Sequence, residues 1–99
     1  MSRSLAELQV ATHRSVFDGP GSTDASARRH IGLDEPPAEL ADLVRKIRDH
    51  AYRITDADVD GLRARYTEDQ LFEVIVSAAL GAAEYRLHAA LATLDGACD

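Results

Sequence analysis

Residues 72–91, FEVIVSAALGAAEYRLHAAL, constrain the fold more than any other part of the chain. The stretch has helical character, and apolar or small residues occupy nearly every side of the helix that it would form. A helix of that kind is normally buried all round. A chain of 99 residues offers little else to cover it, because a small domain buries only a modest part of its surface. We therefore predict that another copy of the chain covers part of this helix.

The composition favours a single all-α domain, residues 1–99, of about five helices. Ala and Leu carry most of the apolar content, aromatic residues make up 5%, and there is no Trp. The net charge of −6 disfavours contact with phosphate backbones, so we expect no nucleic-acid partner. No apolar run approaches the length of about 18 residues that a membrane span needs. The N-terminus lacks the apolar core of a signal peptide, which leaves the cytoplasm as the expected location.

Apolar periodicity and capping residues divide the chain into N-terminal helices with a Gly- and Pro-rich connection, 1–36, and a main helical core, 37–94. The pattern predicts helices over 4–17, 24–30, 37–53, 56–65 and 68–94. Thr23, Thr55 and Thr67 precede three of these helices as N-cap residues. Gln70 is placed to complete a capping box with Thr67. An Asp-Gly pair at 95–96 is expected to end the last helix.

One narrow polar stripe remains on the last helix. Its members share an angle because eleven residues make almost three turns, and they are Glu73, Ser77, Glu84 and His88. If the stripe lines a cleft, Glu73 and His88 are candidate catalytic residues, acting as base and acid. Ser77, Glu84, Tyr85 and Arg86 are then candidate binding residues. The alternative is that the stripe faces water or a polar seam between subunits.

Glu84 and His88 stand four residues apart, a spacing that can supply two metal ligands from one helix face. No Cys or Asp pattern completes a ligand set, and such a pair is more often a simple helix ion pair. We therefore expect no metal and no cofactor. His13, His30 and His50 are scattered along the chain and are expected to be exposed rather than catalytic.

Residues 50–87, HAYRITDADVDGLRARYTEDQLFEVIVSAALGAAEYRL, resemble the carboxymuconolactone decarboxylase-like, or alkylhydroperoxidase D-like, family. The matching residues are Ala51, Tyr52, Arg53, Thr55, Asp56, Asp58, Val59 and Leu62, then Asp69, Phe72, Glu73, Ala78, Ala79, Arg86 and Leu87. The resemblance spans about residues 40–94. It implies an all-α fold whose long C-terminal helix is buried in a homo-oligomer, which could be a trimer, a hexamer or a dimer.

Redox-active members of this family carry a Glu, a Cys-x-x-Cys pair 12 and 15 residues later, and a His four residues further on. Counted from Glu73, those positions hold Tyr85, His88 and Ala92. If the helix is aligned instead with the family's non-catalytic half, Arg86 matches the family's arginine and no cysteine is expected. The only cysteine in the chain is Cys98, so both alignments predict that there is no dithiol peroxidase activity.

Family members that act on carboxymuconolactone lack the dithiol and use general acid–base chemistry. The decarboxylase domain is longer than this chain, and the part that normally precedes the match is largely absent. The resemblance therefore favours a non-peroxidase accessory or small-ligand-binding subunit, which could accompany a larger homologous enzyme. The alternative is an acid–base lyase or isomerase for a small lactone-like acidic metabolite.

Overall fold

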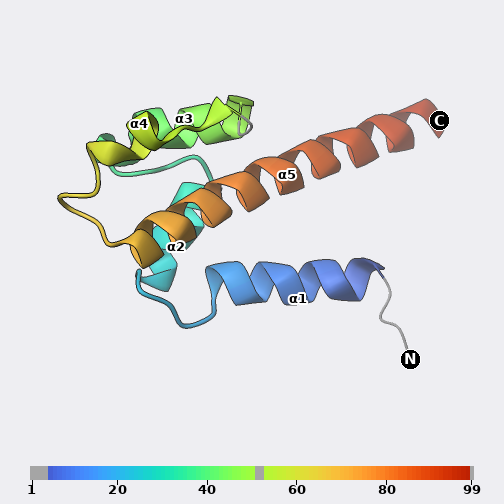
Figure 1. The fold of residues 1–99 in the computed structure, drawn as a ribbon. Coiled ribbons are helices and arrows are strands. Elements are labelled where there is room, and N and C mark those ends of the chain that lie inside the picture. Colours follow the sequence, from blue (N-terminus) through green and yellow to red (C-terminus); the bar gives the residue numbers. More distant parts are fainter. Residues whose placement is uncertain (1–4, 51–52, 99) are drawn as a thin grey trace.

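The computed structural model describes residues 5–50 and 53–98 (Figure 1). The described residues form the helices α1 (Leu5–Phe17), α2 (Ala25–Gly32), α3 (Ala41–His50), α4 (Asp56–Asp60) and α5 (Glu68–Cys98), with a short 3₁₀ helix, η1 (Ala38–Leu40), before α3. No strand occurs within these two ranges. The predicted all-α fold of about five helices is therefore confirmed.

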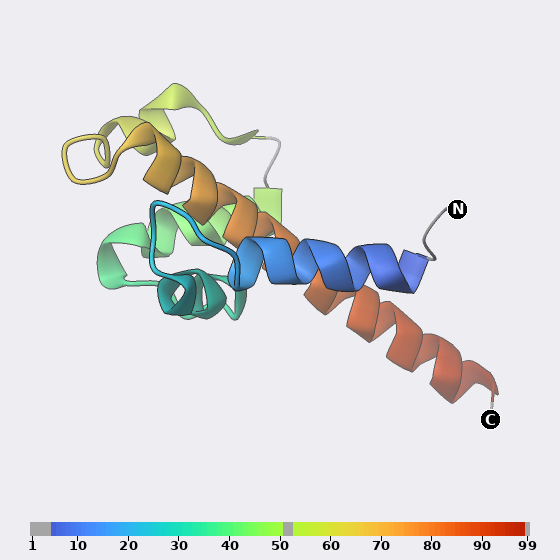
Figure 2. The same cartoon turned by 90° about the horizontal axis from the view of Figure 1, so that it is seen from below.

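The 31-residue helix α5 is the axis around which the other helices are arranged. Helices α3 and α4 lie on one side of α5, α1 lies on the other side, and α2 packs beside the first half of α5 (Figure 1). Seen from below, α1 crosses α5 (Figure 2). The second half of α5 extends past α3 and α4, and the molecule measures 51 × 30 × 22 Å.

The core lies between α2, α3 and the first half of α5. Its buried side chains recur at helical spacing, and they are Ile31, Leu40, Leu43, Val44, Ile47, Val59, Leu71, Val74 and Ala78. This pattern explains why α3 buries only one stripe, because its remaining positions carry charged residues. On α5 the last buried side chain is Ala82, and none is buried from 83 to 94. The helix therefore has a core half and an outer half.

Two glycines let α2 and α5 pack with their backbones in contact. A Cβ atom on Gly81 would lie 2.1 Å from the carbonyl oxygen of Gly32. A Cβ atom on Gly32 would lie 2.5 Å from the Cε1 atom of Phe17, so α1 covers the same crossing. Only residues without a side chain fit at this close approach.

Two of the predicted N-terminal caps are present. The Thr67 hydroxyl accepts a hydrogen bond from the Gln70 backbone N–H at 3.1 Å, and the Gln70 side-chain oxygen accepts one from the Thr67 N–H at 2.9 Å. At α4, the Asp58 carboxylate accepts the Thr55 backbone N–H at 2.8 Å. Both devices satisfy amides that lack a partner within their own helix.

Other sequence-based expectations for the helix ends were wrong. The N-cap of α2 is Asp24, and the hydroxyl of Thr23 is buried without a hydrogen-bond partner. Helix α4 ends at Asp60, and turns follow it over 61–65. Helix α5 continues past the Asp-Gly pair at 95–96 to Cys98, because a glycine weakens a helix without necessarily stopping it.

The predicted helix over 37–53 is divided in the structure. It begins as the 3₁₀ turn η1 and continues as α3 to His50, and residues 51–52 lie outside the described residues.

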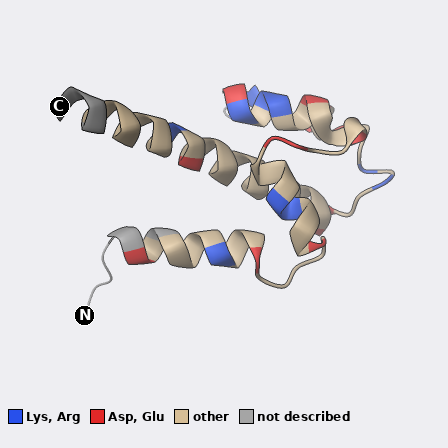
Figure 3. Ribbon diagram, turned by 180° about the vertical axis from the view of Figure 1, so that it is seen from behind, with Lys and Arg blue, Asp and Glu red and all other residues tan. Residues whose placement is uncertain are grey.

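The outer half of α5 is apolar but exposed within one chain. Leu87, Leu91 and Leu94 are 40%, 48% and 61% exposed. Figure 3 shows that this part of the helix carries few charged residues. In the described part of the chain, no helix combines the length and the apolar character needed to cross a membrane. The predicted burial of the helix on all sides is therefore not achieved by a single copy.

Candidate functional site

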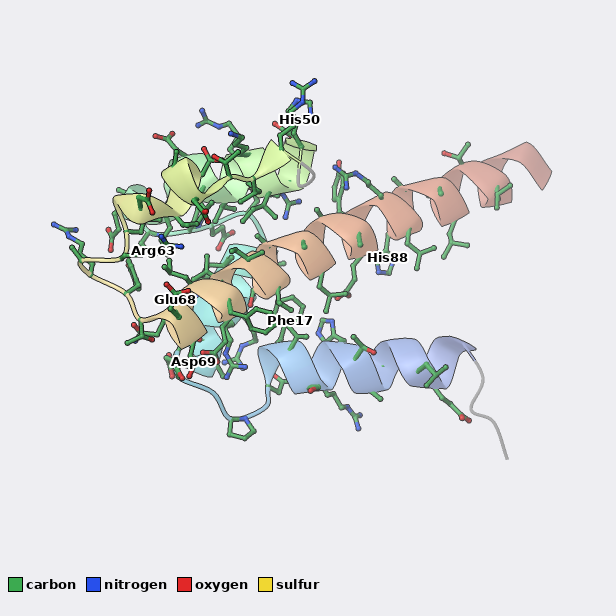
Figure 4. All side chains as sticks on the ribbon, viewed as in Figure 1. Phe17, His50, Arg63, Glu68, Asp69 and His88 are labelled. Carbon is green, nitrogen blue, oxygen red and sulfur yellow. The ribbon has the colours of Figure 1, made fainter. Side chains whose placement is uncertain are left out.

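A cavity of about 410 Å³ lies where α1, α2 and the start of the outer half of α5 meet, with one residue contributed by α3. Its wall is formed by His13, Phe17, Arg29, Gly32, Leu33, Arg48, Gly81, Glu84, Tyr85 and His88. The crossing of Gly32 and Gly81 forms part of this wall, and Phe17 lies between α1 and α5 (Figure 4). We call this space the interhelix cavity.

A histidine and a carboxylate form a pair inside the interhelix cavity. The Nδ1 atom of His13, on α1, lies 2.9 Å from both carboxylate oxygens of Glu84, on α5. Because an ionised carboxylate only accepts, Nδ1 carries the hydrogen and donates it to Glu84. In the neutral ring the lone pair is then on Nε2, where it is available as a base. The ring of His13 also packs on Phe17, with the centroids 4.8 Å apart.

Two arginines give the interhelix cavity cationic walls. Arg29 donates to the Asp18 carboxylate at 3.0 Å. Arg48 donates to the carbonyl oxygen of Gly32 at 3.3 Å, and its Nε lies 3.8 Å from the Asp34 carboxylate. Since a guanidinium has five N–H donors, these contacts leave donors for a ligand. A guanidinium fork suits a planar carboxylate.

The rest of the wall is largely apolar. Phe17 is buried, whereas Leu33 and Tyr85 are 71% and 70% exposed. Apolar surface with a few converging polar groups is the usual composition of a small-molecule site. The arrangement can therefore hold an apolar body with an acidic group attached.

Three of the residues predicted from the sequence lie in this cavity and three do not. Tyr85, Glu84 and His88 line it. Glu73 and Ser77 line a separate, smaller cavity.

Arg86 lines neither of these two cavities, and it donates a hydrogen bond to the carbonyl oxygen of Arg48. The proposed base and acid, Glu73 and His88, are therefore not brought together within one chain. Neither His88 nor Arg86 is the partner of Glu73, whose carboxylate instead accepts the backbone N–H of Ser22.

The sequence interpretation missed His13, Arg29 and Arg48 as site residues. His13 is exposed, as the sequence predicts, with 47% of its side chain accessible, and it is paired with Glu84. Val10, His13 and Phe17 recur at helical spacing, which places His13 on the face of α1 that carries Phe17. That spacing was a usable signal, whereas nothing in the sequence brings Arg29 and Arg48 to the same cavity.

Comparison with known proteins gives no relative: no family model, no curated protein and no solved structure matches this chain. Within residues 5–50 and 53–98, no group of three or more His, Cys, Asp or Glu side chains is arranged to hold a metal ion. Inference about function therefore depends on the geometry of the interhelix cavity and on the resemblance over residues 40–94.

Proposed function

We propose that the protein is a cytoplasmic, non-peroxidase homo-oligomer of the carboxymuconolactone decarboxylase-like family. In this proposal it is an accessory or small-ligand-binding subunit, and its ligand is a small carboxylate with an apolar body. The ligand occupies the interhelix cavity. The observation that supports the proposal is the presence of Arg29 and Arg48 in the wall of a cavity of about 410 Å³ that also contains the apolar side chains of Phe17 and Leu33.

The charges of the cavity support an acidic ligand. Among the described residues of the wall, Glu84 is the only one with a carboxylate, and His13 already bonds both of its oxygens. Arg29 and Arg48 are partly neutralised by Asp18 and Asp34, which lie outside the wall, but both keep further N–H donors for a ligand. A carboxylate that bonds to these guanidinium groups recovers more free energy than a neutral group, because charge-assisted hydrogen bonds are stronger.

Calorimetry with benzoate and its neutral analogue benzamide tests this proposal. Benzoate is expected to bind at least about tenfold more tightly than benzamide, which is the value of one charge-assisted hydrogen bond. Arg29→Gln should reduce the affinity for benzoate and leave that for benzamide unchanged. Arg65→Gln, on an exposed turn outside the cavity, is the matched control. Equal affinity for the two probes would contradict an acidic ligand.

The His13–Glu84 pair supports a second candidate, an acid–base lyase or isomerase for a lactone-like acid. Here His13 Nε2 takes a proton from the ligand, and Glu84 holds the ring and stabilises its charged form. Exchange of a ligand proton for deuterium in D₂O, measured by NMR, separates this candidate from simple binding. Exchange that His13→Gln abolishes would support the enzyme, and binding without exchange would support the binding subunit.

A further inference from the structure

A regular series of leucines and alanines runs along the side of α5 that faces away from the core. Its members follow one another at alternating steps of four and three residues, and they are Val76, Leu80, Ala83, Leu87, Ala90 and Leu94. Such steps give a period of 3.5 residues, which is the period of a coiled coil. The core residues Leu71, Val74 and Ala78 lie on the opposite side of the helix. We call the six residues the heptad seam.

None of the six residues of the heptad seam is buried by the described part of the chain. Val76 and Leu80 are partly exposed, and the other four are exposed. The seam contains no charged residue over about 27 Å of helix. A continuous exposed apolar strip of this length is typical of a surface that contacts another protein.

The alternation of large and small side chains makes the heptad seam complementary to a second copy of itself. Two copies that run in opposite directions and cross at residue 85 bring each leucine opposite a smaller side chain. The facing pairs, with one member from each copy, are Leu80–Ala90, Leu87–Ala83 and Leu94–Val76. Large against small fills the contact evenly and lets the two helices approach closely. A parallel pair would place leucine on leucine and alanine on alanine, which leaves gaps at the alanine layers.

Two charged side chains near the centre of the heptad seam are held by groups of their own chain. Glu84 and Arg86 lie at the two edges of the seam. The Glu84 carboxylate bonds to His13 and is 18% exposed, and Arg86 donates to the carbonyl oxygen of Arg48. In an antiparallel pair each of them lies near the same residue of the second copy. Contacts that turn them away from the seam therefore reduce the repulsion between like charges.

We propose that α5 pairs with α5 of a second copy as a close-packed antiparallel coiled coil along the heptad seam. The inference rests on the homo-oligomer proposed above and gives it a direction and a register. The first half of one α5 then lies beside the outer half of the other, which covers the part of the helix that extends past α3 and α4 (Figure 1). A helix pair of this length is at the low end of the sizes of specific interfaces, below about 1,200 Å², so we expect micromolar association.

Sedimentation equilibrium of the full chain and of Ala83→Leu tests the pairing. Ala83→Leu adds apolar surface, but in the proposed register the new side chain meets Leu87 of the second copy and forces the helices apart. We expect it to weaken the dimer at least about tenfold. Because Ala83 is exposed, the variant should fold normally, which circular dichroism checks.

Two further variants show whether the effect depends on the register. Ala83→Leu combined with Leu87→Ala exchanges the large and the small member of a facing pair, so it should restore most of the lost affinity. Ala89→Leu adds the same side chain outside the seam, and it should leave the affinity unchanged.

Disulfide formation between introduced cysteines determines the direction of the pair. In a Cys98→Ser background, a mixture of Ala83→Cys and Leu87→Cys should form a linked dimer on mild oxidation, whereas each variant alone should form little. A parallel pair would link each variant to itself. A mixture of Ala83→Cys with Ala89→Cys is the control and should not cross-link.

The outcomes separate this pairing from the homo-oligomer on which it rests. A dimer that Ala83→Leu leaves unchanged, or disulfides that form in each variant alone, would overturn the antiparallel seam and leave the homo-oligomer standing. A wild-type chain that is monomeric at micromolar concentration would contradict both.

Discussion

Gly81 shows how strongly a single position can control this fold. Because a Cβ atom there would lie 2.1 Å from the carbonyl oxygen of Gly32, the clash is with backbone and cannot be relieved by a change of rotamer. We expect Gly81→Ala to lower the free energy of unfolding by about 1–3 kcal/mol, the usual cost of overpacking. Urea denaturation followed by circular dichroism measures the change.

Gly61→Ala is the matched control for this prediction. No atom lies within 4 Å of a Cβ built on Gly61, and its φ of −64° is ordinary for alanine. This variant should be neutral or more stable by about 0.4–1 kcal/mol, because alanine restricts the unfolded chain. If both glycine variants had the same stability, the close helix crossing would be contradicted.

Asp58 gives the stability of the protein a predictable dependence on pH. The Lys46 ammonium group donates to its carboxylate at 2.8 and 2.9 Å, and this contact, followed by the Thr55 backbone N–H, lowers the pKa of Asp58 below its ordinary value of 3.8. A group whose pKa is lower in the folded state stabilises the fold above its unfolded pKa. That stabilisation is lost as the pH falls through the folded pKa.

We therefore expect Asp58→Asn to be less stable than the wild type at pH 7, and the difference to shrink as the pH falls below 3.8. Urea denaturation at a series of pH values measures this. Asp42→Asn is a suitable control, because Asp42 is an exposed carboxylate in the first turn of α3. A difference between Asp58→Asn and wild type that stayed constant with pH would contradict the role given to Lys46.

At the scale of elements, the sequence predicted helices well and their ends and mutual contacts poorly. The Thr67–Gln70 capping box was predictable because all of its groups lie within four residues. The end of α5 was not predictable in this way, because the Asp-Gly pair at 95–96 is a local stop signal that competes with the helical propensity of the preceding residues. The contact of His13 with Glu84 joins residues 71 apart, and local patterns carry no information about such a pair.

The capping box at the start of α5 gives an element-scale prediction. Thr67→Ala removes the oxygen that accepts the Gln70 N–H, and it should destabilise the protein by about 1 kcal/mol. Thr12→Ala is the matched control, because the Thr12 hydroxyl only donates to the carbonyl of Leu8 within α1. That change should cost little, since such back-bonding does not stabilise a helix. Thermal denaturation compares the two, and equal losses would show that the box is unimportant.

At the scale of the whole molecule, the two halves of α5 have different environments. Its first half is enclosed by α2 and α3, whereas Leu87, Leu91 and Leu94 remain exposed. These leucines recur at helical spacing on one face, as expected of a helix that packs on a partner. This distribution supports the proposed homo-oligomer, and we propose that the subunit contact lies on the outer half of α5.

Substitution on the exposed leucine face tests this assembly. Leu91→Glu would bury a charge in the subunit contact at a cost of several kcal/mol, so light scattering should show a smaller species than the wild type. Ala89→Glu, on the opposite side of α5, should leave the mass unchanged. A wild-type protein that is already a monomer of 10.7 kDa at micromolar concentration would contradict the assembly.

We propose above that the interhelix cavity binds a small carboxylate with an apolar body. The most direct test is the location of the amide chemical-shift changes that benzoate causes in ¹⁵N-labelled protein. We predict saturable changes at His13 of α1, Gly32 of α2, and Gly81 and Tyr85 of α5, all of which line the cavity. The proposal is contradicted if benzoate causes no saturable change, or if the changes lie elsewhere on the molecule and leave these four residues unaffected.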